Sequence, residues 1–165
     1  MTKPLWAPWR LEYIQAADEQ DGCVFCLAAE GDDEAKLVVH RGRRAFVLLN
    51  KFPYASGHLM VAPFRHGGDF AELDDEEALE LHRLAGLGLD ALAAVYRPDG
   101  ANLGWNLGRV AGAGVLDHVH LHVVPRWAGD TNFMPVLADV KVMPEHLAET
   151  RRKLADAWPG SSRGG

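Results

Sequence analysis

Three histidines stand at alternate positions in the short segment HVHLH, as His118, His120 and His122. Side chains alternate between the two faces of an extended strand, so the three imidazoles should share one face while Val119 and Leu121 occupy the other. Imidazole is well suited to attack an electrophile, to move protons or to bind a metal near neutral pH. Because neighbouring imidazoles repel when they are charged together, three on one face predict a chemical site.

The two cysteines, in the sequence CVFC, form a second candidate site. Cys23 and Cys26 are close enough to be a metal knuckle, a redox pair or a coincidence. A redox pair normally opens a helix directly after a strand, and nothing strand-like precedes Cys23. The spacing therefore favours zinc, with a buried pair of reduced thiols as the alternative.

The size and charge of the chain limit the class of protein. Its 165 residues are most simply one domain over residues 1–158, with an aromatic N-terminal arm over residues 1–22 and a disordered tail over residues 159–165. The net charge of -6 argues against a protein that coats nucleic acid, because neutralising phosphates needs a dense positive surface. No apolar run approaches the roughly 20 residues of a membrane span, and the N-terminal segment lacks the apolar core of a signal peptide. We expect a cytoplasmic protein that binds neither a nucleic-acid polymer nor a membrane.

The pattern of apolar residues predicts an α+β fold with a mainly antiparallel sheet. A glycine within the first β-rich run indicates a hairpin over residues 36–50, and a third strand follows over residues 58–64. After a helix, ANLGWNLG at residues 101–108 returns to strand, and the histidine segment forms the last strand, which runs to Trp127. Residues 128–143 are expected to be irregular or edge structure.

A long helix separates these two groups of strands. Asp74 or Asp75 could cap it, and it should continue for about 20 residues. Ala85 and Gly88 are small enough to let the helix approach the sheet closely. A short C-terminal helix is expected to begin at Pro144. The apolar stripe of the long helix consists of Leu81, Leu84, Leu92 and Val95.

Two motifs, in this order, resemble the histidine triad (HIT) family of nucleotide hydrolases and transferases. The first, PxxxGHLMVxPxxH, runs from Pro53 to His66, and the second, HxHxHVVPR, runs from His118 to Arg126. The resemblance covers roughly residues 20–127. It implies a HIT-like fold with an antiparallel sheet, one long helix and a short C-terminal helix, and a reaction through a nucleotidyl-histidine intermediate.

The resemblance assigns a role to each histidine of the reaction. In this family the middle histidine of the triplet attacks the α-phosphorus of a nucleoside phosphate or dinucleoside polyphosphate. Carried over, His120 is the nucleophile, and it needs a hydrogen bond on one ring nitrogen that leaves the lone pair of the other free. His122 would touch the phosphate oxygens and stabilise their growing charge, and His58 would hold the geometry.

A set of substrate contacts is implied in the same way. Asn50 would meet the ribose hydroxyls. Backbone N–H groups of the glycine-rich loop GRVAGAG, together with Asn106, would lie against the phosphates. The residues expected to bind substrate are Asn50, Lys51, Asn106, Gly112, Gly114 and Arg126, and Arg109 is a further candidate for a phosphate contact.

Some bacterial family members carry a CxxC pair whose zinc is completed by the histidine of PxxH and by the first histidine of the triplet. The matching residues here are Cys23, Cys26, His66 and His118. Four such ligands fill a tetrahedral site, which implies a structural zinc with no open position for chemistry. Zinc would also fix His118, and with it the strand that presents His120.

The loop before the triplet departs from many family members, which have Gln followed by Ser or Thr there. The sequence AGAGVLDH offers neither, so those bonds must come from the backbone or elsewhere. LWAPWRLEYI at the start and HVVPRWAGDTNFMPVL after the triplet resemble the bacterial diadenosine tetraphosphate phosphorylase branch. That branch transfers the nucleotidyl group to inorganic phosphate and not to water, and residues 127–134 would contact the acceptor or the second nucleotide.

Three alternatives stay open at this point. A hydrolase of the same family, acting on nucleoside phosphoramidates or dinucleoside polyphosphates, would use water as the acceptor. A metal-dependent hydrolase would use the three histidines as ligands, although such a site normally recruits carboxylates and Asp117 should point to the opposite face. A non-enzymatic nucleotide-binding module would bind its ligand without turnover.

The resemblance also implies a homodimer that pairs through the long helix and an edge of the sheet. The sequence itself gives modest support, since Trp105 and the small residues of the helix could also pack within one subunit. His40, His82 and His146 match no motif and are expected to be surface or packing residues.

Overall fold

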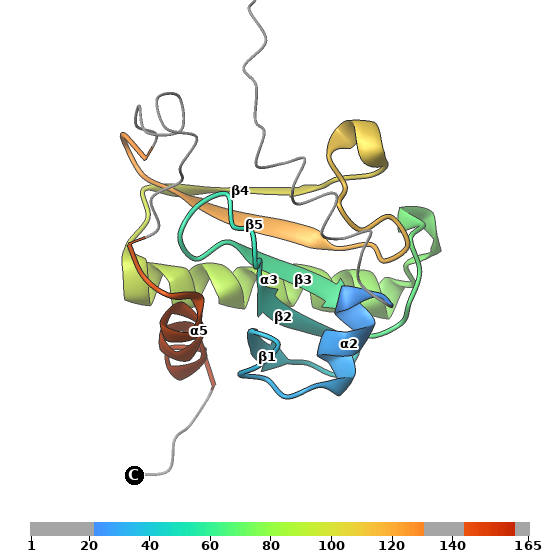
Figure 1. The fold of residues 1–165 in the computed structure, drawn as a ribbon, viewed down its shortest axis with the longest axis horizontal. Coiled ribbons are helices and arrows are strands. Elements are labelled where there is room, and N and C mark those ends of the chain that lie inside the picture. Colours follow the sequence, from blue (N-terminus) through green and yellow to red (C-terminus); the bar gives the residue numbers. More distant parts are fainter. Residues whose placement is uncertain (1–21, 131–143, 161–165) are drawn as a thin grey trace, which may run out of the picture.

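The computed structural model describes residues 22–130 and 144–160. Its centre is a five-stranded antiparallel sheet in the order β1-β2-β3-β5-β4, with the long helix α3 packed against β2, β3 and β5 (Figure 1). The shorter helices α2 and α5 lie toward the β1 side of the sheet. The predicted α+β fold with an antiparallel sheet is confirmed.

The elements follow the predicted order, with one helix added near the start of the described chain. The strands are β1 (Val38–Arg41), β2 (Ala45–Leu49), β3 (Leu59–Pro63), β4 (Gly100–Trp105) and β5 (Leu121–Arg126). The helices are α2 (Val24–Glu30), α3 (Asp75–Tyr96) and α5 (Leu147–Asp156), with short 3-10 turns η1 (Phe70–Glu72) and η2 (Arg109–Ala111). Because β5 inserts between β3 and β4, the end of the histidine segment that belongs to β5, Leu121 and His122, lies inside the sheet and not at its edge.

Both faces of the sheet are covered, as β2 shows. Val47 and Leu49 belong to the core against α3 and α5. Phe46 and Leu48 belong to a second core on the other face, with Phe25 of α2. Every residue of β2 is therefore buried, which explains why this strand reads as a continuous apolar run and not as an alternating one.

Helix α3 begins with a capping box. The Asp74 side chain accepts a hydrogen bond from Glu77 N at 2.7 Å, and Glu77 Oε2 accepts one from Asp74 N at 3.2 Å. The two bonds satisfy backbone donors that have no partner within the helix. The helix ends at Arg97, which adopts a left-handed conformation with φ 48°.

One face of α3 packs on the sheet, as its sequence predicts. At Gly88 an added Cβ would lie 3.1 Å from Leu59 Cδ1, so the small residue permits the close approach to β3. The approach brings the apolar stripe into the core. Leu81, Leu84, Leu92 and the small Ala85 are buried, and Val95 is partly buried.

The C-terminal helix starts later than predicted, at Leu147 and not at Pro144. Glu145 accepts a hydrogen bond from the Tyr96 hydroxyl at 2.6 Å, which ties the residues before the helix to the end of α3. The N-terminal arm except residue 22, residues 131–143 of the irregular segment and residues 161–165 of the tail lie outside the described residues. Within the described ranges, no helix has both the length and the apolar composition needed to cross a membrane.

Candidate active site and metal site

The three histidines of the triplet are all buried, on the face of the sheet that α2 covers. Only His122 lies within β5, and His118 and His120 precede its first residue. Phe25 of α2 packs on the rings of His118 and His120, with ring centres 5.0 and 4.6 Å away. Leu121 packs instead in the core on the α3 face. The alternation expected of an extended chain therefore holds across the triplet.

A main-chain carbonyl fixes the protonation pattern of His120. Its Nδ1 lies 2.8 Å from the carbonyl oxygen of His118. Because a carbonyl oxygen only accepts, Nδ1 must carry the proton, and the lone pair of a neutral ring is then on Nε2. Burial lowers the pKa of His120, which keeps the ring neutral near pH 7. The ring therefore meets the requirements of a nucleophile.

Hydrogen bonds also fix which ring nitrogen carries the proton in His58 and in His122. The backbone N–H of Tyr54 donates to His58 Nδ1 at 3.0 Å, so a neutral His58 carries its proton on Nε2. His58 Nε2 lies 2.9 Å from His122 Nδ1 and donates to it. The proton of a neutral His122 is consequently on Nε2, where it could donate to a phosphate oxygen. The side-chain amide of Asn106 lies 3.4 Å from that atom.

A hollow of about 380 Å³ is linked to these rings through Phe25, which lines it and packs on His120, while the histidines themselves are not among its lining residues. Its wall is mainly apolar and includes residues of α2, β2 and β3 and of the segments before β1 and after β2. Asn50 and Lys51 are among its few polar residues, and Asn50 Oδ1 accepts a hydrogen bond from Phe52 N at 2.9 Å. A mostly apolar hollow with few polar groups is typical of a site for a small organic ligand.

The glycine-rich loop after β4 needs two left-handed backbone positions. Gly108 has φ 85° and Gly112 has φ 92°, on either side of η2, and side chains disfavour this region. Gly114 follows in the same loop, and Asn106 places this end of the chain beside His122. Arg109 is exposed in η2.

The predicted phosphate contact Arg126 is already engaged. Its Nε donates to Asp130 Oδ2 at 2.6 Å and its Nη1 to Asn102 Oδ1 at 2.9 Å, at the far end of β5 from the triplet. The three histidines that match no motif lie in two kinds of environment. His40 stacks on Trp158 with ring centres 4.8 Å apart, whereas the remaining two are exposed.

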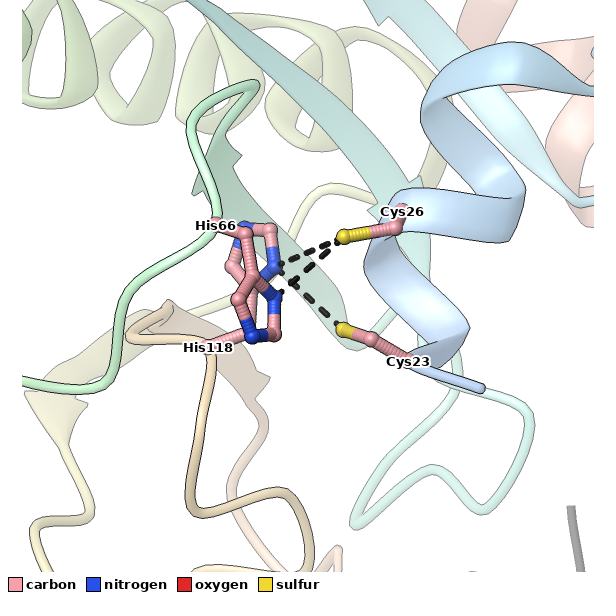
Figure 2. Close-up of side chains that lie close together, drawn as sticks. All are labelled: Cys23, Cys26, His66 and His118. Carbon is pink, nitrogen blue, oxygen red and sulfur yellow. Dashed lines mark hydrogen bonds between the residues drawn. The ribbon is translucent and has the colours of Figure 1, made fainter. Parts of the chain in front are cut away.

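The second group of side chains brings together Cys23, Cys26, His66 and His118 (Figure 2). The four ligand atoms all lie within 4.8 Å of one another. Cys23 Sγ and Cys26 Sγ lie 3.3 and 3.7 Å from His118 Nδ1, and Cys26 Sγ lies 3.3 Å from His66 Nδ1. Two thiols and two imidazole nitrogens gathered in this way fit a tetrahedral zinc ion. Among the described residues this is the one group with a complete set of such ligands.

Each histidine of this group turns Nδ1 toward sulfur and has an acceptor behind it. His118 Nε2 lies 2.8 Å from the carbonyl oxygen of Pro63, so Nε2 carries the proton and Nδ1 is bare. His66 Nε2 lies 3.7 Å from Asp117 Oδ2. Acceptors on the outer nitrogen are characteristic of metal-binding histidines. Burial, followed by the neighbouring Cys23, raises the pKa of the Cys26 thiol to about 11, and a bound cation would reverse this preference.

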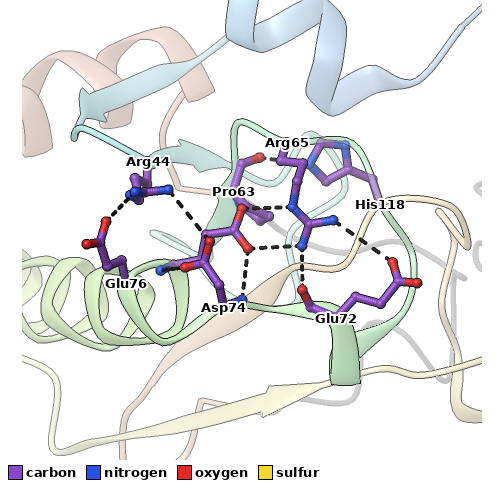
Figure 3. Close-up of polar contacts among 8 residues, drawn as sticks. Arg44, Pro63, Arg65, Glu72, Asp74, Glu76 and His118 are labelled. Atoms are coloured by element: carbon purple, nitrogen blue, oxygen red, sulfur yellow. Dashed lines mark hydrogen bonds and ion pairs between the residues drawn. The ribbon is translucent and has the colours of Figure 1, made fainter.

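The segment that carries His66 is held to the start of α3 (Figure 3). Arg65 donates from Nε and Nη2 to the two carboxylate oxygens of Glu77, both at 2.9 Å, and from Nη2 to the Glu72 carbonyl at 2.8 Å. Arg65 holds the pKa of the buried Glu77 carboxyl below its usual value. The segment with Pro63 and His66 is therefore fixed to the start of α3.

A tight backbone contact joins the same segment to the triplet. Val119 N donates to the carbonyl oxygen of Gly67 at 2.8 Å. At Gly68 an added Cβ would lie 2.3 Å from the Leu116 carbonyl oxygen, well inside contact distance. Only glycine fits there while the two segments stay together.

Three residues of the site lacked a signal in the sequence reading. Phe25 stands between the two cysteines and packs on His120, Tyr54 occupies a variable position of the first motif, and Asp117 pairs with His66. Asp117 was expected on the opposite face, away from the chemistry. The alternation seen across the triplet does not extend back to Asp117, which lies in a bend of the loop between η2 and β5.

Comparison with known proteins places this arrangement in a family. The HIT domain model matches residues 32–129, and the chain belongs to the histidine triad family. The AP-4-A phosphorylase of Mycobacterium tuberculosis is 39% identical over 162 residues, which are 93% of this chain and 83% of that protein. A HIT-like protein of Saccharolobus solfataricus is 32% identical over 112 residues, 68% of this chain and 79% of its own. The crystal structure of a Zn-bound histidine triad family protein from Mycobacterium smegmatis superposes with a TM-score of 0.65 at 25% identity, over 82% of this chain and 92% of that one.

Proposed function

We propose that the protein cleaves dinucleoside polyphosphates by transferring a nucleotidyl group to His120 and then to inorganic phosphate. The observation that carries this proposal is the 2.8 Å contact between His120 Nδ1 and the His118 carbonyl, in a buried ring whose pKa is lowered. Together they leave a neutral imidazole with its Nε2 lone pair available for attack on phosphorus.

The other residues of the site have complementary tasks in this proposal. His122 donates from Nε2 to an oxygen of the reacting phosphate, and His58 keeps it in that tautomer. The nucleoside occupies the hollow, where Asn50 meets the ribose and Lys51 lies at the wall. The phosphates run past Asn106 and the loop with Gly112 and Gly114, and Arg126 would have to leave Asp130 and Asn102 to contact them.

Phosphate is the proposed acceptor because of similarity to a named relative. The M. tuberculosis protein with 39% identity is an AP-4-A phosphorylase. A hydrolase would share the first half of the reaction and differ only in using water for the second. The acceptor is therefore decided by products and not by the geometry of His120.

Zinc is proposed as a structural ion held by Cys23, Cys26, His66 and His118. Bound there, it would supply four bonds that join α2 to the end of β3 and to the triplet. Its ligands include His118 but neither His120 nor His122, so the reacting rings stay separate from the metal-binding group. The superposed Zn-bound protein of the same family supports this assignment.

We also propose a homodimer in the cytoplasm. Among the described strands, the edge strand β4 pairs only with β5, and its Leu103, which is 47% exposed, lines one groove with the exposed Phe70. A groove of about 590 Å³ runs between β4, η1 and α3. An open strand edge with exposed apolar residues is suited to a second copy of the chain. Both cysteines are free, in keeping with a reducing compartment.

The test is to incubate the protein with diadenosine tetraphosphate, with and without inorganic phosphate, and to separate the products. Transfer to phosphate yields ADP and ATP, whereas transfer to water yields AMP and ATP. AMP formed in excess phosphate would reject phosphate as the acceptor. Mass spectrometry after an alkaline quench should find the nucleotidyl group on His120. Binding without turnover would instead support the non-enzymatic module.

A further inference from the structure

Four aromatic rings form a row through the site, from a closed end to an open one. Phe25 packs on His120 with ring centres 4.6 Å apart, His120 on His122 at 4.8 Å, and His122 on Tyr54 at 5.9 Å. Phe25 is 1% exposed and lines the hollow, whereas Tyr54 is 44% exposed. The row therefore leads from the hollow, across the nucleophile, to the surface.

Tyr54 is joined to both histidines at the open end. Its backbone N–H holds His58, and its ring centre lies 4.7 Å from that of His58. The ring is nearly parallel to that of His122, with an angle of 26° between the planes. In the part of the chain that the structure describes, the hydroxyl of Tyr54 makes no hydrogen bond.

Tyr54 and Phe52 belong to the same loop but face different parts of the site. Both are 44% exposed. Phe52 lines the hollow, and Tyr54 does not. Within one loop, an apolar ring therefore serves the hollow, and a ring with a hydroxyl stands beside His122. The two residues form a natural pair for comparison.

The direction in which the leaving group departs from phosphorus brings it toward Tyr54. Attack and departure at phosphorus are roughly in line, so the leaving oxygen moves away from His120. If the nucleoside fills the hollow at the Phe25 end, the anionic leaving half must continue toward the open end. A tyrosine hydroxyl there is a hydrogen-bond donor beside a chain of negative charges.

We propose, on the basis of the proposed function, that Tyr54 binds the leaving half of the substrate through a hydrogen bond from its hydroxyl to the phosphate next to the scissile bond. The acceptor enters by the reverse path and occupies the same place. Tyr54 therefore favours leaving groups and acceptors that carry phosphate. It selects polyphosphate substrates, while the hollow selects the nucleoside.

The experiment compares Tyr54→Phe with the wild type on two substrates that share the adenylyl group. Diadenosine tetraphosphate has a polyphosphate leaving group, and the 4-nitrophenyl ester of AMP has one without phosphate. For Tyr54→Phe, kcat/KM should fall about tenfold or more for the dinucleotide, the effect of losing a hydrogen bond to a charged group. It should stay within about twofold for the ester, because the ring and the backbone bond to His58 remain.

Phe52→Leu is the matched control, because it alters the hollow that both substrates use. It should lower kcat/KM for the two substrates by similar factors. Equal losses on both substrates in Tyr54→Phe, or no loss on the dinucleotide, would overturn the role of Tyr54. If the wild type turned over neither substrate, the proposed function would be wrong. In that case, calorimetry with ADP would test the role of Tyr54 separately. Weaker ADP binding by Tyr54→Phe than by the wild type would support the proposed phosphate contact, and equal affinity would overturn it.

Discussion

The proposed metal-binding group of Cys23, Cys26, His66 and His118 and the proposed nucleophile His120 use histidines two residues apart, yet His118 and His120 present opposite ring nitrogens. His118 donates a hydrogen bond from Nε2 to the carbonyl of Pro63 and turns Nδ1 toward the cysteine sulfurs. His120 donates a hydrogen bond from Nδ1 to the carbonyl of His118 and leaves Nε2 available. A main-chain carbonyl thus decides in each case which nitrogen has a lone pair to offer.

This difference between His118 and His120 shows that residue type alone does not decide whether a histidine is suited to bind a metal or to act as a nucleophile. The two regions also share one residue. The ring of His118 belongs to the metal-binding group, while its carbonyl oxygen orients His120. Changes on one side should therefore reach the other through the backbone at this residue and through Phe25, which packs on both rings, and mutations can test this.

The largest effect is expected for His120→Asn. Removing the proposed nucleophile should lower kcat by roughly four powers of ten or more, while zinc content stays at the wild-type level because this ring is outside the proposed metal-binding group. Activity assays and atomic absorption measure the two. His82→Asn, an exposed change on α3, is the control and should keep full activity. Loss of zinc in His120→Asn would show that the two regions are not separate.

An intermediate effect is expected when both Cys23 and Cys26 are replaced by Ser. Zinc content should fall to background, and Tm by roughly 5–10 °C, since a ligand at about 100 times its dissociation constant contributes about 2.7 kcal/mol. Activity should fall about 10- to 100-fold as His118 loses its support. Wild-type protein treated with chelator should show the same Tm. Full zinc occupancy in the double variant would discard the metal assignment.

The smallest effect concerns the support behind the metal-binding group. Arg65 lowers the pKa of Glu77 from its ordinary value of 4.5, so their interaction stabilises the fold above that pH and its contribution is lost as the pH falls through and below it. Arg65→Ala should lower the free energy of unfolding at pH 7, and the difference from wild type should shrink at pH 3. Urea unfolding at the two pH values measures this.

Arg83→Ala is the control for that experiment, because Arg83 is exposed on α3 and has no ion pair among the described residues. It should leave stability nearly unchanged at both pH values. A difference between Arg65→Ala and wild type that did not depend on pH would mean that Arg65 acts by packing alone.

The sequence predicted the sheet and α3 because their apolar patterns are long and regular. The hairpin, the strands around the histidines and the start of α3 at Asp74 follow from such patterns. Helix α2 left no comparable signal. It has seven residues, its N-cap Cys23 makes no side-chain cap bond, and no acidic residue stands in its first turn. A helix so short is formed by packing Phe25 into the core and not by its own propensity.

The motifs predicted which side chains gather at the site, but not the contacts that direct them. The four metal-binding candidates do meet. The tautomers of His118 and His120 depend on carbonyls whose direction only the fold sets. The places of Tyr54 and Asp117 depend on loops, where side-chain direction follows no simple period.

Gly68 has no reactive group, yet it has no room for even one methyl group against the Leu116 carbonyl. A substitution to alanine would wedge apart two stretches of chain, one with His66 and the other with His118. We therefore expect damaging variants in a population to include substitutions of Gly68, although this residue has no chemically active side chain.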